Sequence, residues 1–143
     1  MNVTTKFHLK FFDSAAVLGA VDKARVRVLS RIGAFIWRRE KSSMRRTKKS
    51  APPGQPPRAH AGQLKDLNFF SYDASTRSVV IGPVKFGTGT APRTLEEGGS
   101  ETIQSHGKRV TAYYRPHPFM RPALEAELRA GTLPREWANS VRT

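Results

Sequence analysis

The 143-residue sequence contains no cysteine, which excludes disulfide bonds and cysteine-ligated zinc sites and is typical of a reducing compartment. It also lacks an apolar run near the roughly 20 residues that a membrane-spanning helix needs. Residues 1–12 mix lysines with apolar residues and do not form a signal peptide, although a loose alternation indicates a short strand over residues 5–12. We therefore expect no membrane association, and a chain of this length predicts one domain.

The sequence also shows no residue pattern typical of a catalytic or metal-binding site. The four histidines are scattered without ligand spacing, and Glu96 and Glu97 are adjacent, so their carboxylates point apart instead of sharing one space. Residues 87–89 superficially resemble a phosphate-binding loop but lack its Lys-Ser/Thr ending and a following helix. We expect no enzymatic activity, no metal and no cofactor.

Acidic residues are scarce in the first part of the chain. The net charge is +14, and residues 1–60 hold 14 Lys and Arg residues against three acids, whereas residues 61–143 hold 11 against eight. A basic run of this kind suits nucleic acid, an acidic protein surface or an anionic membrane, the last being the weakest candidate. The residues predicted to face DNA or an acidic partner are Arg38, Arg39, Arg45, Arg46, Lys48 and Lys49.

A long amphipathic helix is predicted after Asp13 or Ser14, either of which offers an N-cap, and it runs to about Met44. Its apolar residues recur at spacings of three and four and form one continuous stripe, which indicates packing against a core. Gly19 and Gly33 each weaken a helix by about 1 kcal/mol relative to Ala. Close packing against a neighbouring element would compensate for that loss.

The second half of the chain predicts two antiparallel hairpins. The first pairs residues 64–72 with residues 78–84, and the second pairs residues 102–104 with residues 108–114. Between them, residues 85–101 are rich in Gly, Thr and Pro and are predicted to form a loop.

Three prolines within seven residues make the segment at residues 115–128 the most distinctive in the chain. Proline fixes its own φ and moves the preceding residue out of the helical region, so the first half of this segment is predicted to be a rigid extended strap. Pro122 suits the first position of a helix that continues to Ala130, and Gly131 ends it.

A second proline-rich segment, residues 45–62, is too long for a tight connection. A backbone preset by proline lowers the cost of ordering when a segment binds a partner. We expect this loop and the strap to supply a subunit or partner interface, with Pro52, Pro53, Pro56, Pro57, Arg115, Phe119 and Met120 as the candidate residues.

Together these elements predict an α+β fold, in which an antiparallel sheet of about four strands packs against the long N-terminal helix and a short C-terminal helix. The predicted domain covers residues 1–131, with extended loops at residues 45–62 and 85–101. Residues 132–143 are predicted to form a C-terminal tail.

Four segments, taken in order, resemble the putative tail-component proteins of tailed bacteriophages, the neck and tail-completion group between head and tail. They are the amphipathic helix, the proline-glycine-proline loop with its following strand, the valine-rich strand with the LEEGGS loop, and the strap with its helix, at residues 17–43, 50–70, 78–100 and 115–128. The resemblance covers most of the chain. The sequence departs from it at Glu97, where the family pattern has an aromatic or apolar residue.

The resemblance implies a virion structural protein of the phage neck or tail-completion region, made in the bacterial cytoplasm, with no catalytic residues. Such proteins form homo-oligomeric rings around the DNA channel and join the head connector or stopper proteins to the tail terminator or tail-tube proteins. An alternative stays open on the residues alone. A small basic protein that binds nucleic acid without sequence preference would carry the same charge.

Overall fold

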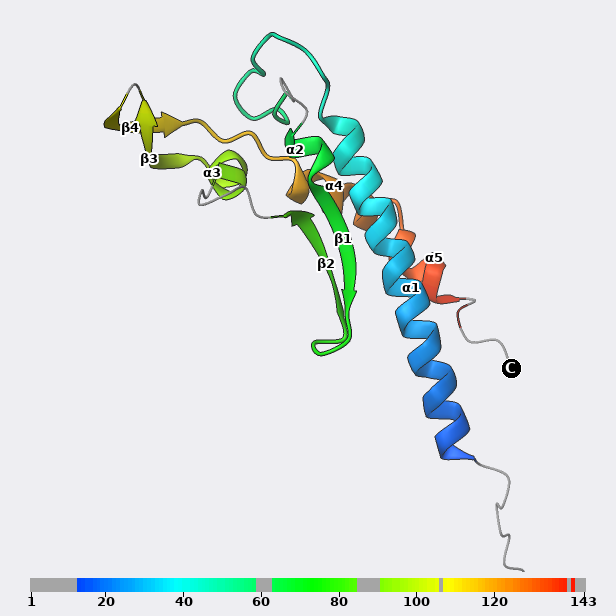
Figure 1. The fold of residues 1–143 in the computed structure, drawn as a ribbon. Coiled ribbons are helices and arrows are strands. Elements are labelled where there is room, and N and C mark those ends of the chain that lie inside the picture. Colours follow the sequence, from blue (N-terminus) through cyan, green and yellow to red (C-terminus); the bar gives the residue numbers. More distant parts are fainter. Residues whose placement is uncertain (1–12, 59–62, 85–90, 106, 139, 141–143) are drawn as a thin grey trace, which may run out of the picture.

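The structure, a computed structural model, describes residues 13–58, 63–84, 91–105, 107–138 and 140 (Figure 1). The strand predicted over residues 5–12 lies outside the described residues. The described elements are α1 (Ser14–Ser43), α2 (Gln63–Asp66), β1 (Asn68–Asp73), β2 (Ser78–Pro83), α3 (Ala91–Glu97), β3 (Gly99–Ser105), β4 (Lys108–Tyr114), α4 (Met120–Arg129) and α5 (Thr132–Ala138).

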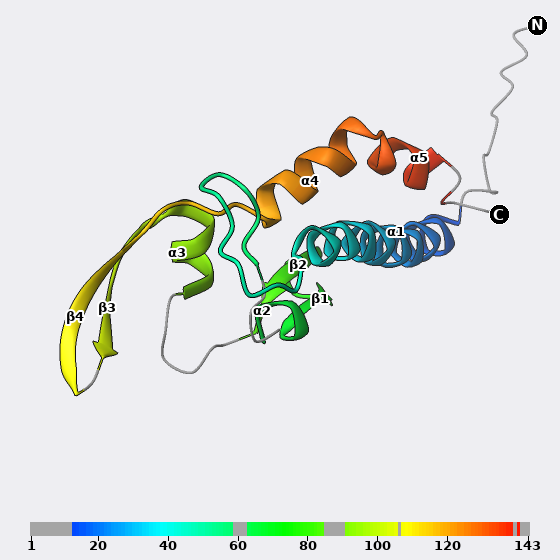
Figure 2. The same cartoon turned by 90° about the horizontal axis from the view of Figure 1, so that it is seen from above.

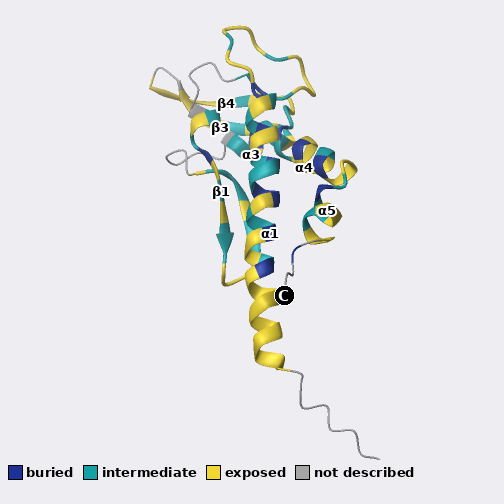
Figure 3. Ribbon diagram, turned by 90° about the vertical axis from the view of Figure 1, so that its right-hand side faces the viewer, coloured by how far each residue is buried: buried dark blue, intermediate teal, exposed yellow. Residues whose placement is uncertain are grey.

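Helix α1 confirms the predicted long helix. Asp13 caps it, because the Asp13 side chain accepts a hydrogen bond of 3.0 Å from the backbone N–H of Ala16. The apolar stripe, however, is buried only from Ala24 onward, where Val28, Ile32 and Ile36 face the core. Residues 14–23 are exposed throughout, and this end of α1 projects beyond the other elements (Figure 3).

The core lies where α1 passes between two layers (Figure 2). The ribbon β1–β2 packs on one side of α1, and the helices α4 and α5 pack on the other. We call these five elements the body. Its central cluster joins three layers of the body, with the residues Val28, Ile32, Ile36 and Ala123 at its centre and Ile81 and Leu133 packed against them.

The ribbon β1–β2 approaches α1 closely at Gly33. A Cβ atom on Gly33 would lie 2.6 Å from a methyl carbon of Val79, far inside ordinary contact distance. The predicted close packing is therefore confirmed for Gly33. It is wrong for Gly19, because no atom lies within 4 Å of the Cβ position there. One turn beyond Gly33, the Trp37 ring packs against Phe70 of β1 with 5.6 Å between centroids.

The α+β class is confirmed, but the strands do not form one sheet. They form two separate antiparallel two-stranded ribbons, β1–β2 and β3–β4. Only the first packs on α1, whereas β3–β4 projects from the opposite side of α3 (Figures 1 and 2). We call α3, β3 and β4 the arm.

Several of the predicted boundaries are wrong around the ribbons. The strand predicted over residues 64–72 begins as the short helix α2 at Gln63–Asp66, and β1 starts only at Asn68. The loop predicted over residues 85–101 contains α3 and the start of β3, which begins at Gly99 instead of residue 102. The sequence of α3 offers a proline in the first turn and an Arg93–Glu97 ion pair at spacing four, 3.1 Å long.

The end of the chain also differs from the prediction. Helix α4 ends before Gly131, whose φ of +65° is the left-handed conformation that a helix-ending glycine adopts. The residues predicted as a tail continue into α5, which starts at the buried residue Thr132. The Thr132 hydroxyl donates a hydrogen bond of 2.5 Å to Glu127 of α4 and holds the two helices together.

Candidate interaction surfaces

Glu96 of α3 fastens the arm to the body. Its carboxylate accepts hydrogen bonds from three backbone N–H groups at the start of α4, at 2.8 Å from Phe119, 3.1 Å from Met120 and 2.9 Å from Arg121. A helix leaves these amides unpaired, and its dipole favours a negative charge there. The sequence placed Glu96 in the loop predicted over residues 85–101 and assigned it no role. One feature of the sequence pointed to this contact. Phe119, at the N-cap of α4, has no side chain that can accept hydrogen bonds from the first helix amides, so another residue must do so.

The joint is also closed by backbone contacts. The His117 amide donates to the Leu95 carbonyl at 2.6 Å, and the Gly98 amide donates to the Thr94 carbonyl at 2.9 Å. Gly98 has a φ of +75°, and a Cβ there would lie 3.0 Å from Pro116. Glycine is required at this position by both its conformation and its close neighbour.

The strap and the proline loop bind each other. The Gly54 amide donates to the Pro116 carbonyl at 2.9 Å, and the His117 ring Nδ1 lies 3.0 Å from the Gln55 carbonyl oxygen. Pro57 is buried. Both segments thus use part of their surface inside the chain, and the candidate interface residues that stay exposed are Pro52, Pro53 and Arg115.

Phe119 and Met120 occupy different environments. Phe119 is 1% exposed and belongs to the interior of the body, so its assignment to a partner interface is wrong. The strap carries it inward as the chain enters α4, which packs on α1 through Ala123 and Glu127. Met120 is half-buried and reaches the ribbon β1–β2, where its methyl carbon lies 3.5 Å from the Cβ position of Gly82.

The basic run is divided by its ion pairs. Arg39 donates to Glu127 at 2.5 Å, and Arg46 donates to Asp66 at 2.9 and 3.0 Å. The first pair is partly buried, and the Thr132 hydroxyl together with Arg39 holds the pKa of Glu127 below its usual range. Within the described part of the chain, the predicted contacts without an ion pair are Arg38, Arg45, Lys48 and Lys49.

Carboxylates, in contrast, are mostly engaged inside the molecule. Asp22 pairs with Arg25, and Glu136 pairs with Arg31 at 3.3 Å. Asp73 accepts hydrogen bonds from Ser75 and Thr76, which lower its pKa to about 2. The outward field of the molecule is consequently dominated by cations.

A polar cluster is buried where α1 meets β1. Glu40 and Asn68 are both fully buried, and the Asn68 side-chain amide donates to one oxygen of Glu40. Trp37 donates to the backbone carbonyl of Asn68 at 2.7 Å. The second oxygen of Glu40 and the amide oxygen of Asn68 have no hydrogen-bond partner. Burial raises the pKa of Glu40 to about 7, and a proton there supplies the donor that the cluster lacks.

The outer face of the ribbon β1–β2 is an apolar cradle. Side chains alternate along a strand, so the residues that do not face α1 share this outer face. Phe69 is 51% exposed and Val80 is 58% exposed. The groove they border holds about 420 Å³, and its outer lining consists of Phe69, Ser71, Val80, Gly82, Val84 and Met120.

The ribbon β3–β4 is exposed on both faces. Ile103 lies opposite Val110 in the register, and both are exposed. Tyr113 is 85% exposed and Tyr114 is also exposed. A two-stranded ribbon without a covered face is marginally stable by itself in water. This ribbon and the cradle are the surfaces that sequence reasoning missed, because it assigned all four strands to one sheet.

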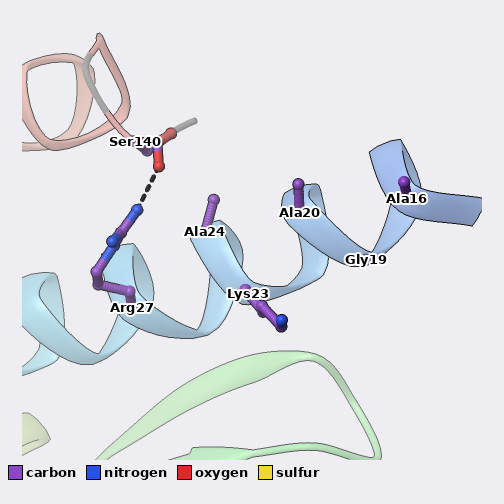
Figure 4. A pocket seen from close by; sticks show the side chains of 7 residues that line it. All are labelled: Ala16, Gly19, Ala20, Lys23, Ala24, Arg27 and Ser140. Atoms are coloured by element: carbon purple, nitrogen blue, oxygen red, sulfur yellow. Dashed lines mark hydrogen bonds between the residues drawn. The ribbon is translucent and has the colours of Figure 1, made fainter. Parts of the chain in front are cut away.

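A second groove runs along the projecting half of α1 (Figure 4). It holds about 540 Å³ and is bordered by small residues at successive turns, among them Ala16, Ala20 and Ala24. Arg27 closes one end by donating to the backbone carbonyl of Ser140. Because the alanine side chains are small, few protruding groups line the groove.

Comparison of the chain with protein families, with curated proteins and with solved structures finds no match. Within the described residues, no group of three or more His, Cys, Asp or Glu side chains is placed to hold a metal ion. None of the helices in that part of the chain has the length and apolar character needed to cross a membrane.

Proposed function

We propose that the chain is a virion structural protein of the neck or tail-completion region of a tailed phage. In this role it forms a homo-oligomeric ring around the DNA channel and joins the head connector to the tail. The proposal assigns no catalytic step to the chain. It is based on the resemblance of four segments, which occur in the same order as in the phage proteins. The structure supports it with a physical observation on the projecting ribbon.

The observation that carries the proposal is the arm. The protein places fourteen strand residues on a ribbon that contributes nothing to the core cluster of the body. Exposed apolar side chains on such a ribbon are unfavourable in water, and burying them on assembly stabilises the complex. A joint closed by Glu96 and Gly98 fixes the direction in which the ribbon points, as an assembly contact requires.

Self-association and location test this proposal. The purified chain should form a closed ring, which light scattering after size exclusion and negative-stain imaging would detect. In the phage that encodes it, the gene should lie between head and tail-tube genes, and antibody against the chain should label the neck. Labelling of the capsid interior or of host nucleoid alone would contradict the proposal.

The unpaired cations favour a second candidate, sequence-independent binding to DNA. Arg45, Lys48 and Lys49 lie together on the loop that follows α1, where they can neutralise phosphates without reading bases. The test is the affinity of the isolated chain for duplex DNA as a function of salt. A steep salt dependence that Arg45→Glu and Lys48→Glu reduce, with no ring formed, would favour this function over the first.

A further inference from the structure

We propose that the arm of one copy binds the cradle of the next copy, with the Ile103–Val110 face of the β3–β4 ribbon laid on the Phe69–Val80 face of the β1–β2 ribbon. The inference rests on the proposed ring and names the contact that builds it. A head-to-tail contact of this kind joins two different surfaces of the same chain and can close into a ring.

The two surfaces match in chemistry and in length. One face of the arm carries Ile103, Val110 and Ala112, and the cradle is lined by Phe69 and Val80. The arm has strands of seven residues and the cradle has strands of six, so each extends roughly 20–24 Å.

The charges are complementary as well. Copies with a net charge of +14 repel, so contact between them is favoured where cations are few. Among the strand residues of the cradle face, Asp73 is the one charged residue. The Ile103–Val110 face of the arm carries one cation, Lys108, and one acid, Glu101, whereas Arg109 lies on the opposite face.

Strand alternation places one pair of opposite charges, Lys108 and Asp73, where the turn ends of the two ribbons meet. Lys108 shares a face with Val110, and Asp73 shares a face with Phe69. Both charged residues lie at the turn end of their ribbon. Laying the arm along the cradle with its tip toward the β1–β2 turn therefore brings Lys108 to Asp73 while the base of the arm covers the Met120 end.

The same chain cannot satisfy its own surfaces. The arm points away from β1–β2, and α3 is the main contact of its ribbon among the described elements (Figures 1 and 2). The joint at Glu96, Gly98 and Pro116 holds this direction. A second copy supplies the missing partner for both surfaces at once.

Two complementary variants test the contact. Val110→Asp disables the arm and leaves the cradle intact, and Val80→Asp disables the cradle and leaves the arm intact. Because both side chains are exposed, both variants should keep the wild-type unfolding temperature. Each alone should associate at least tenfold more weakly than the wild type, and an equimolar mixture should form a dimer that grows no further, which light scattering resolves.

Cysteine cross-linking provides the second measurement, because the chain has no cysteine of its own. A Val80→Cys chain mixed with a Val110→Cys chain should form a disulfide-linked heterodimer. Arg109→Cys, on the opposite face of the arm, is the matched control and should not cross-link to Val80→Cys.

The outcomes separate this contact from the ring itself. A wild-type ring that both Asp variants leave intact overturns the arm-to-cradle contact while the proposed function stands. Cross-linking of Val110→Cys to itself instead of to Val80→Cys overturns it in favour of an arm-to-arm contact. Loss of DNA binding by Val110→Asp with unchanged self-association also overturns it, and a wild-type chain that stays monomeric overturns ring and contact together.

Discussion

The body and the arm use similar strands in opposite ways. In the body, β1–β2 presses Phe70 and Val79 against α1, and the ribbon gains its stability from that contact. In the arm, β3–β4 has the same antiparallel pairing and a similar alternation but leaves both faces in solvent. The alternation pattern of a ribbon therefore does not decide its role, which depends on whether a helix covers one of its faces.

The largest expected contrast between the two regions is at aromatic residues. Phe119→Ala removes a side chain that is 1% exposed in the body and should lower the free energy of unfolding by about 3–5 kcal/mol. Tyr113→Ala removes one that is 85% exposed in the arm and should change it by less than about 0.5 kcal/mol in the monomer. Urea unfolding measures both, and equal losses would contradict the division into body and arm.

The next contrast concerns pH and the buried Glu40. Its pKa in the folded protein is about 7, above the usual value of 4.5, so its contribution is fully present below pH 4.5 and is lost as pH rises through 7. Allowing for solvent screening, the free energy of unfolding should fall by about 2 kcal/mol between pH 4.5 and 8.

Glu40→Gln is the matched variant for that prediction. It keeps the shape, removes the titration and supplies an amide donor to a cluster that has two unpartnered oxygens. Unfolding followed from pH 4.5 to 8 should therefore be flatter for the variant than for the wild type. A wild-type slope that persists in Glu40→Gln would assign the pH dependence to another group.

Glu96 is where the two regions can be uncoupled. Glu96→Gln weakens three hydrogen bonds at the start of α4 and should cost about 1–2 kcal/mol, with faster hydrogen exchange at the Phe119 and Met120 amides. Glu97→Gln is the neighbouring control, since Glu97 makes only an exposed pair with Arg93, and it should change neither quantity measurably. Similar exchange in the two variants would show that the joint does not depend on this carboxylate.

The smallest contrast lies within α1, between its covered and projecting halves. Gly33→Ala places a Cβ against Val79 and should destabilise by about 1 kcal/mol, after the gain in helix propensity is included. Gly19→Ala meets open space and should stabilise by about 0.5–1 kcal/mol. Thermal unfolding of the pair gives the test, and stabilisation by both substitutions would indicate that Val79 yields easily.

Local signals in the sequence were sufficient for the long helix and for the pairing of both hairpins, whereas they placed the start of α4 at Pro122 instead of Met120. They act over a few residues, through the Asp13 cap, turn residues and alternation. What they could not give was the contact of Glu96 with amides more than twenty residues away, because that depends on how the arm returns to the body. The separation of the two ribbons and the inward position of Phe119 were out of reach for the same reason.

The joint at Glu96 and Gly98 has a consequence for the geometry of assembly. In the proposed head-to-tail ring, the rotation from one subunit to the next depends on the direction of the arm relative to the cradle within each chain. A sixfold ring and a sevenfold ring differ by only about 9° in this rotation. If the proposed ring forms, one carboxylate and one glycine would thereby help to set the number of subunits and the bore of the ring.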